Sequence, residues 1–164
     1  MRALIAGVGL VLASSTSVRA DGCPTSTVDI ADWPVVRSAR VPGFTFRLPR
    51  SFTRDSAVTA REAAPSARWS DGARARFALS HPSTGAAPAQ LPSAEGATSS
   101  RCDTSVGGAT ATIVTYADGA TAYIVQAHIR WPDGEAVEVR ADAPSRAHVE
   151  LLIAALRTIR RAGA

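Results

Sequence analysis

Three Asp-Gly pairs occur between residues 67 and 140, at Asp71-Gly72, Asp118-Gly119 and Asp133-Gly134. Each pair lies between segments in which apolar and polar side chains alternate. Alternation with a period of two is typical of strands that bury one face, and Asp-Gly is typical of the tight turns that join antiparallel strands. The pattern therefore predicts a run of β-hairpins in one antiparallel sheet.

The last of these turns also predicts a register. Ala127 and Ile129 can share a buried face with Val137 and Val139 only if the loop has an odd number of residues, because a shift by one residue reverses the face of every side chain. A three-residue loop over 132–134 meets this condition, with proline opening a type I turn and glycine in the left-handed conformation. It pairs residue 129 with 137 and residue 127 with 139.

The same loop length predicts registers for the two earlier turns. The expected cross-strand pairs are Ile113 with Tyr123, Ala111 with Val125, Trp69 with Ala73, and Ala67 with Ala75. In this arrangement Arg74 and Arg76 point away from the buried face.

Other segments complete the expected fold. Phe44–Pro49 alternates and predicts a short strand, Val58–Glu62 predicts a weaker one, and 81–100 is rich in Pro, Ala, Ser and Gly and predicts a flexible loop. A C-terminal helix is predicted with Asp142 as its cap and Pro144 in its first turn.

One face of that predicted helix is apolar, and its end is basic. The apolar side chains at helical spacing are Val149, Leu152, Ile153, Leu156 and Ile159, and the basic ones expected in the last turn are Arg157, Arg160 and Arg161. Residues 21–164 are therefore expected to form a single α+β domain in which an antiparallel sheet of hairpins is covered by this helix.

Residues 1–20 have the three parts of a secretory signal peptide. A basic start is followed by an apolar run over 3–13 and by a small-residue segment that ends at Ala20. The apolar run is shorter than the roughly 20 residues that cross a bilayer, so no transmembrane segment is expected after cleavage. We expect an exported protein of the periplasm or the extracellular space. Lipidation at Cys23 remains an alternative to a free new N-terminus at Asp21.

Cys23 and Cys102 are the only cysteines in the chain. In an oxidising compartment they are expected to form a disulfide, because they lack the C-x-x-C spacing of redox catalysts. The closed loop of about 80 residues would contribute about 4 kcal/mol of stability through the entropy of the unfolded chain.

The charge of the chain does not favour nucleic-acid binding. Cleavage after Ala20 removes Arg2 and Arg19, which leaves 16 arginines against 14 acidic residues, a net charge of about +2. The arginines are interleaved with acids and there is no lysine, a composition typical of a GC-rich bacterial genome. No metal or cofactor is expected either, because the three histidines lack ligand spacing and no phosphate-binding loop or Gly-x-Ser-x-Gly elbow is present.

The predicted register of the last hairpin brings together one polar group. His128 falls opposite Glu138, Gln126 falls opposite Arg140, and Arg130 lies beside them. A histidine next to a carboxylate can act as a general base or as a pH-sensitive contact for a partner, or it can be a cross-strand polar pair on a wet sheet face. These five residues are the candidate binding site, and no catalytic residue is assigned.

The strand Phe44–Pro49 followed by Phe52, the run of hairpins and the closing segment 151–160 together resemble the PsbP-like group of small exported proteins. The resemblance spans most of residues 42–161. It implies an α/β/α sandwich around an antiparallel sheet and a binding or assembly role without catalysis.

The expected function is therefore that of an exported, non-catalytic binding or assembly domain of the bacterial cell envelope. Its partner would be a protein or another envelope component that the sequence does not identify. Two alternatives remain: a small secreted hydrolase that uses His128 and Glu138, and a secreted inhibitor or signalling domain that uses the 81–100 loop.

Overall fold

Antiparallel strand pairing organises the protein in the computed structural model, which describes residues 23, 26–55, 66–72, 74–82, 99–118 and 122–163. The strands of these residues are β1 (Val35–Arg37), β2 (Phe44–Arg47), β3 (Thr53–Arg54), β4 (Ser66–Ser70), β5 (Arg76–Ser80), β6 (Ser99–Val106), β7 (Ala109–Asp118), β8 (Ala122–Arg130), β9 (Ala136–Ala143) and β10 (Arg160–Arg161). The helix α1 spans Arg146–Arg157. The α+β class expected from the sequence is therefore confirmed.

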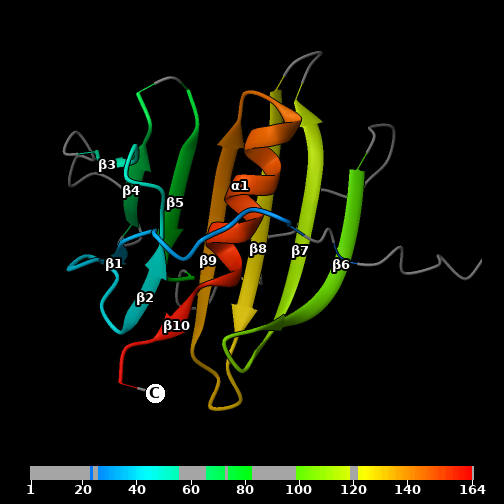
Figure 1. Cartoon of the computed structure of the whole chain (residues 1–164). Helices are drawn as coiled ribbons and strands as arrows, with labels where there is room; N and C mark the ends of the chain where they lie inside the picture. The colour runs from blue at the N-terminus through cyan, green and yellow to red at the C-terminus, as the bar shows by residue number, and fades with distance from the viewer. Residues whose placement is uncertain are drawn as a thin grey trace, which may run out of the picture.

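Seven strands form the main sheet, in the order β3-β4-β5-β9-β8-β7-β6, and every neighbouring pair is antiparallel. Figure 1 shows α1 lying across β8 and β9 on one face of this sheet, with the small sheet β1-β2-β10 on the same side. In the described part of the chain α1 is the one helix, so a second helical layer, which a sandwich would need, is not seen there.

The core lies between the main sheet, α1 and β2. Aromatic rings connect these layers: Phe46 of β2 packs on Trp69 and Phe77, with ring centroids 4.9 and 5.2 Å apart. Phe44 packs in the same way on Trp131, at 5.1 Å. Rings at these separations add to the burial of apolar area, so β2 closes the core beside the helix.

The register predicted for the last hairpin is confirmed. Ile129 pairs with Val137 and Ala127 with Val139, and the ladder continues until the backbone N–H of Trp131 donates to the carbonyl of Glu135. Gly134 has a φ of 91°, as the left-handed loop position requires. Proline decides this loop length, because Pro132 has no N–H to give to the ladder and so cannot extend it.

The registers predicted for the other two Asp-Gly turns are wrong. Ile113 pairs with Ala127 and Ala111 with Ile129, while Trp69 pairs with Phe77 and Ala67 with Leu79. Both turns therefore lie two residues later than predicted. Ser70 and Ala117 have an N–H where the last hairpin has proline, so these ladders continue through the aspartates. The new pairing preserves the face of every side chain, which is why alternation alone could not exclude it.

A hairpin that the sequence interpretation missed helps to set the register of β7. Gly107 and Gly108 form a two-residue turn with φ values of 58° and 79°, which joins β6 to β7 at the pair Val106–Ala109. Two successive positive φ values define the type I′ turn, for which Gly-Gly is a strong signal. This turn means that β7 can begin only at Ala109. In the observed register every residue of β8 has a partner in β7, whereas the predicted register would place the end of β8 beside the turn.

The helix begins later and ends earlier than predicted. Ser145 caps it, with its side-chain oxygen accepting from the backbone N–H of His148, whereas Asp142 belongs to β9. The predicted cap was wrong because β9 stays in its ladder through Ala143, which leaves Ser145 as the next capping side chain. Of the five apolar side chains predicted for the helix face, Val149, Leu152, Ile153 and Leu156 are buried within α1. Ile159 is buried too, but it lies beyond the end of the helix.

Two of the three arginines expected in the last helical turn lie outside the helix. Thr158 ends α1, with its hydroxyl donating to the carbonyl of Ala155 and accepting from the N–H of Arg47 in β2. The chain then becomes extended, so that Arg160 and Arg161 form β10 beside β2. Only Arg157 faces the negative end of the helix dipole from within the last turn.

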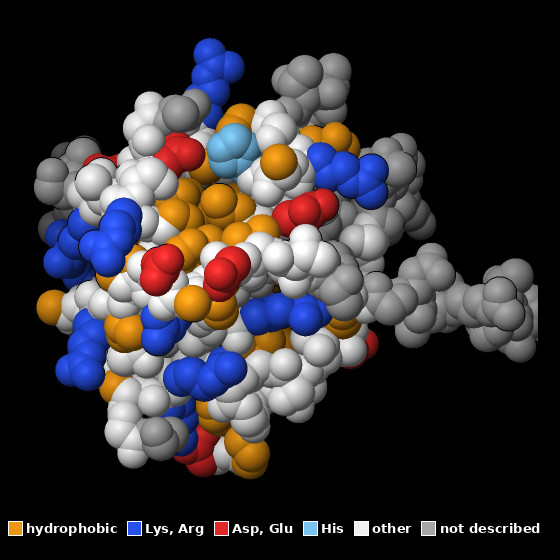
Figure 2. All heavy atoms as spheres, viewed as in Figure 1, with side chains coloured by type: hydrophobic (Ala, Val, Ile, Leu, Met, Phe, Trp, Pro, Cys, Tyr) orange, Lys and Arg blue, Asp and Glu red, His pale blue; other side chains and the backbone are white. Residues whose placement is uncertain are grey.

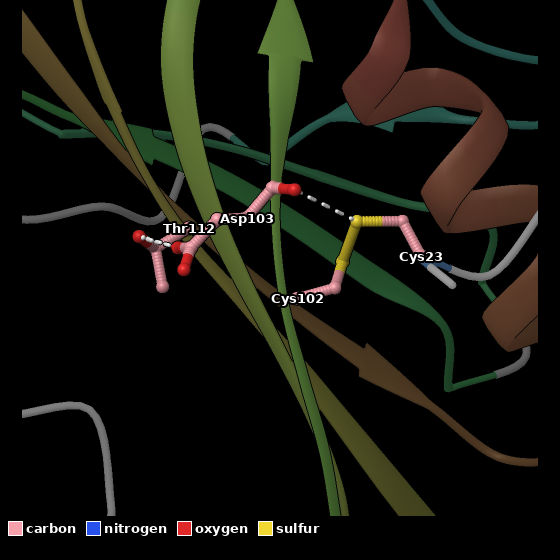
Figure 3. The surroundings of a disulfide bond; sticks show 4 residues. All are labelled: Cys23, Cys102, Asp103 and Thr112. Carbon is pink, nitrogen blue, oxygen red and sulfur yellow. Dashed lines mark hydrogen bonds between the residues drawn. A yellow bond between two sulfur atoms is a disulfide. The ribbon is translucent and has the colours of Figure 1, made fainter. Parts of the chain in front are cut away.

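The predicted disulfide is present. Cys23 and Cys102 are bonded, with their Cα atoms 5.1 Å apart, and Figure 3 shows the bond beside β6. The sulfur of Cys23 also lies 3.6 Å from the carbonyl oxygen of Asp103. From there the chain passes in front of α1 to β1 (Figure 1), and the guanidinium of Arg47 holds it by donating to the carbonyls of Ala31 and Trp33. The disulfide fits an oxidising compartment.

Several predictions fall on residues outside the described part of the chain. These are the signal peptide over 1–20, the weak strand over 58–62 and the greater part of the predicted loop, residues 83–98. The end of that loop was predicted two residues too late, since β6 already begins at Ser99.

The helix side of the molecule carries no large basic surface. Figure 2 shows arginine side chains scattered over this face and interleaved with acidic ones. Within the described residues, no helix has the length and apolar character needed to cross a membrane.

Candidate functional site

The five residues singled out in the sequence lie on the sheet face opposite α1, which we call the second face. Adjacent strands place their side chains there in rows that run across the sheet. One row contains Ser66, Ser80, Glu138, His128, Thr112 and Asp103. The next contains Arg68, Ala78, Arg140, Gln126, Val114 and Arg101. The second face is therefore polar at its centre, in contrast to the apolar face under α1.

The second face is not open to solvent along its whole length. The side chains of Val114 and Ile124 point to it and are only 2% and 5% exposed. Polar and buried apolar groups thus lie next to each other on the same surface.

A hollow of about 210 Å³ lies between the two central rows. Four of the predicted site residues line it, Gln126, His128, Glu138 and Arg140, together with Ala78 and Ser80 of β5 and backbone neighbours. It forms because Ala78 and Ser80 are small, so β5 leaves space beside the longer side chains of β9 and β8. The fifth residue, Arg130, lies at the end of β8 opposite Ala136 and Thr110 and does not line the hollow.

His128 and Glu138 lie opposite each other, as the register predicts. Their nearest atoms, Nδ1 and Oε1, are 3.9 Å apart, which is too far for a hydrogen bond. The two side chains are 19% and 29% exposed. Nδ1 of His128 is itself buried and has no hydrogen-bond partner within the described residues. A buried ring nitrogen without a partner costs about 1–3 kcal/mol.

The side chains around His128 do not supply a nucleophile. The hydroxyl of Thr112 donates to Oδ1 of Asp103 at 2.5 Å, so its proton is already engaged. Ser80 is in the same row as His128 but two strands away, a separation of about 10 Å. Proton transfer needs donor and acceptor within hydrogen-bond distance. Neither Thr112 nor Ser80 is therefore placed to pass a proton to His128.

A second polar cluster, which the sequence interpretation missed, joins α1 to the β4–β5 hairpin. Nδ1 of His148 is 2.8 Å from the hydroxyl of Ser145, and Nε2 is 3.8 Å from Oδ2 of Asp71. The other carboxylate oxygen of Asp71 accepts from the backbone N–H of Ala75. The spacing Ser-x-x-His at a helix start could have indicated this cluster. In such a spacing the side chain of the third helical residue can contact the side chain of the capping residue.

This cluster has the residue types of a hydrolase triad, but its geometry is that of a helix cap. The hydroxyl of Ser145 also accepts from the backbone N–H of His148, at 3.4 Å, so it satisfies the helix terminus. The distance from His148 to Asp71 exceeds that of a hydrogen bond. Its role is to cap α1 and to fix the β4–β5 loop against the helix.

The cap makes a testable contribution to stability. We expect Ser145→Ala to lower the free energy of unfolding by about 1 kcal/mol, because it removes the acceptor for the N–H of His148. Ser145→Asp is the matched control, since aspartate caps equally well and should stay within about 0.5 kcal/mol of the parent. Urea unfolding measures both, and equal loss in the two variants would contradict the capping role.

The opposite end of the sheet is held by a charged clamp between β10 and the β8–β9 loop. Arg161 donates to Oδ2 of Asp133 at 2.5 Å and also to the carboxylate of Glu135. The hydrogen bond from Arg161 holds the pKa of Asp133 below its usual value, and the same bond raises the pKa of Arg161. This clamp fixes the hairpin that carries His128 and Glu138 at its loop end.

No three His, Cys, Asp or Glu side chains gather as a metal site in the part of the chain that the structure describes. In comparisons with known proteins, no family model and no curated protein matches this chain.

Proposed function

We propose that the protein is an exported, non-catalytic domain of the bacterial cell envelope that binds a protein or another envelope component at the hollow on its second face. The observation that carries the proposal is the hollow itself, in which the partly exposed side chains of His128 and Glu138 face each other without a mutual hydrogen bond. Around it, Gln126 and Arg140 offer donors and acceptors on rigid strands. A partner that hydrogen-bonds to this row gains specificity because the site is already ordered.

Two further observations support this proposal. The disulfide between Cys23 and Cys102 is consistent with an oxidising, exported location. The resemblance of residues 42–161 to the PsbP-like group points to a binding or assembly role. Both fit a domain whose rigid fold presents a surface and does not turn over a substrate.

Partner capture with matched variants tests the proposal. The mature chain, residues 21–164, serves as bait for cross-linking in its own cell envelope. We expect His128→Ala and Glu138→Ala to weaken recovery of a specific partner about tenfold or more, because hydrogen bonds to charged groups contribute roughly 1.5–3 kcal/mol. Glu150→Ala on the exposed side of α1 is the control and should leave recovery unchanged. Recovery that is equal in all three variants would rule out the second face as the binding surface.

A panel of hydrolase substrates separates the binding role from the enzyme alternative. We expect no turnover, since neither Thr112 nor Ser80 is placed to pass a proton to His128. Turnover that disappears in His128→Ala or Glu138→Ala would replace the proposal by a small secreted hydrolase. Loss of partner binding on deletion of 83–98, with the second-face variants unaffected, would favour the inhibitor or signalling alternative.

A further inference from the structure

A second hollow, of about 330 Å³, lies on the helix-cap end of the sheet, separate from the one at His128. The β4–β5 loop, the start of β8 and the end of β9 surround it. Its charged and aromatic lining consists of Arg74, Arg76, Asp142 and Tyr123. Asp142 in this lining forms an ion pair at 3.5 Å with Arg140, which lines the hollow at His128.

The charges of this hollow leave a positive excess. Within the described residues, the side chains of Arg74 and Arg76 have no hydrogen bond or ion pair, and both are exposed. Among the described residues of the lining, Asp142 is the one acid, and its carboxylate pairs with Arg140. The lining therefore offers two guanidinium groups to an anion.

The helix adds to this positive potential. Pro144 lines the hollow, and α1 begins two residues later with no acidic side chain in its first turn. The unpaired N–H groups at a helix start carry a partial positive charge, which favours an anion nearby. Here it adds to the charge of the two arginines.

The backbone at Arg74 is strained. It has a φ of 121°, a conformation that residues with a side chain rarely adopt. The loop is held in this shape by Asp71, whose N–H donates to the carbonyl of Ala75 and whose carboxylate accepts from the N–H of Ala75. Strain of this kind is characteristic of functional sites, where the surrounding structure imposes it. Glycine would relieve the strain, yet arginine occupies this position.

We infer that this hollow is an anion-binding site that takes a phosphate group through Arg74 and Arg76. Each guanidinium offers a planar pair of N–H donors that matches two phosphate oxygens. A phosphate with about two negative charges at neutral pH and three or more acceptor oxygens can engage both forks, whereas a carboxylate has one charge and two oxygens. The inference concerns a different hollow from the His128 surface, so each can fail without the other.

Titration with inorganic phosphate at constant ionic strength, followed by NMR, tests the site. We expect Arg74→Ala and Arg76→Ala each to weaken phosphate binding about tenfold or more. Arg50→Ala, an exposed arginine in the loop between β2 and β3, is the matched control and should bind as the parent does. Equal phosphate binding in all variants, or acetate binding as tightly as phosphate, would overturn the inference.

Arg74→Gly separates a binding role from a structural one. Glycine accepts the φ of 121°, so this variant should unfold at the same temperature as the parent or above it, and yet bind phosphate as weakly as Arg74→Ala. Phosphate binding that is unchanged in Arg74→Gly would show that the guanidinium is not needed and would overturn the site.

The source of the phosphate can be distinguished in a parallel experiment. Vesicles of phosphatidylglycerol present the group at a membrane surface, whereas inorganic phosphate presents it free in solution. Binding to the vesicles that depends on Arg74 and Arg76 identifies a lipid headgroup, and binding of free phosphate alone identifies a soluble ligand. If substitution of the two arginines changes neither vesicle binding nor phosphate binding, the inference is wrong.

Discussion

Removal of the disulfide, by Cys23→Ala together with Cys102→Ala, is expected to lower the free energy of unfolding by about 4 kcal/mol. The two cysteines are 79 residues apart in the sequence. Bonding them removes many conformations from the unfolded chain, and the entropy of a closed loop of that length corresponds to about 4 kcal/mol. That is a large part of the 5–15 kcal/mol by which native proteins are usually stable.

Urea unfolding of the mature chain measures this loss, and the parent in reducing buffer is the matched control. Reduction breaks the same bond without a change of sequence, so both should lose similar stability. The competing anchor is Arg47, whose guanidinium donates to the carbonyls of Ala31 and Trp33 in the same N-terminal segment. A loss below about 1 kcal/mol in both samples would mean that such contacts hold the segment without the bond.

Gly107→Ala is expected to lower the free energy of unfolding by about 3 kcal/mol or more. A Cβ at this position would lie 2.4 Å from the carbonyl oxygen of Ile159, so the backbone between α1 and β10 would have to move. Displacing packed groups costs about 1–3 kcal/mol, and the φ of 58° adds about 1 kcal/mol for a residue with a side chain. Ile159 is fully buried, which limits how far its carbonyl can shift.

Gly108→Ala is the control for that experiment. It has the same kind of backbone, with a φ of 79°, but a Cβ there meets nothing within 4 Å. We expect it to cost only about 1 kcal/mol. Urea unfolding of the two variants isolates the contact with Ile159, and equal losses in both would show that the close approach contributes nothing.

The pairing of the candidate site residues could be predicted from the sequence, but the hollow beside them could not. Proline at residue 132 determined the loop, the loop determined the register, and the register placed His128 opposite Glu138 and Gln126 opposite Arg140. The hollow beside them could not be predicted in the same way. It depends on Ala78 and Ser80 in β5, a strand that pairs directly with β9 although Ser80 is 58 residues before its partner Glu138 in the sequence.

The two wrong registers have a common cause. A shift of four residues in the pairing leaves every side chain on the same face, so the apolar pattern of Ala111, Ile113 and Val125 fits both arrangements equally well. Turn position decides between them. At Pro132 it could be predicted from the missing N–H, whereas at Ser70 and Ala117 it depended on how far the neighbouring strands could extend.

By itself the sequence determined which side chains face the core, because a period of two assigns faces without reference to any partner. It also determined the cysteine pair, since no other cysteine is present. Only the tertiary structure decided which strands are neighbours, and with this it decided the two hollows and the cap cluster of Ser145, His148 and Asp71. The physical reason is that these sites combine side chains from strands and loops far apart in the chain, and no local pattern encodes their separation.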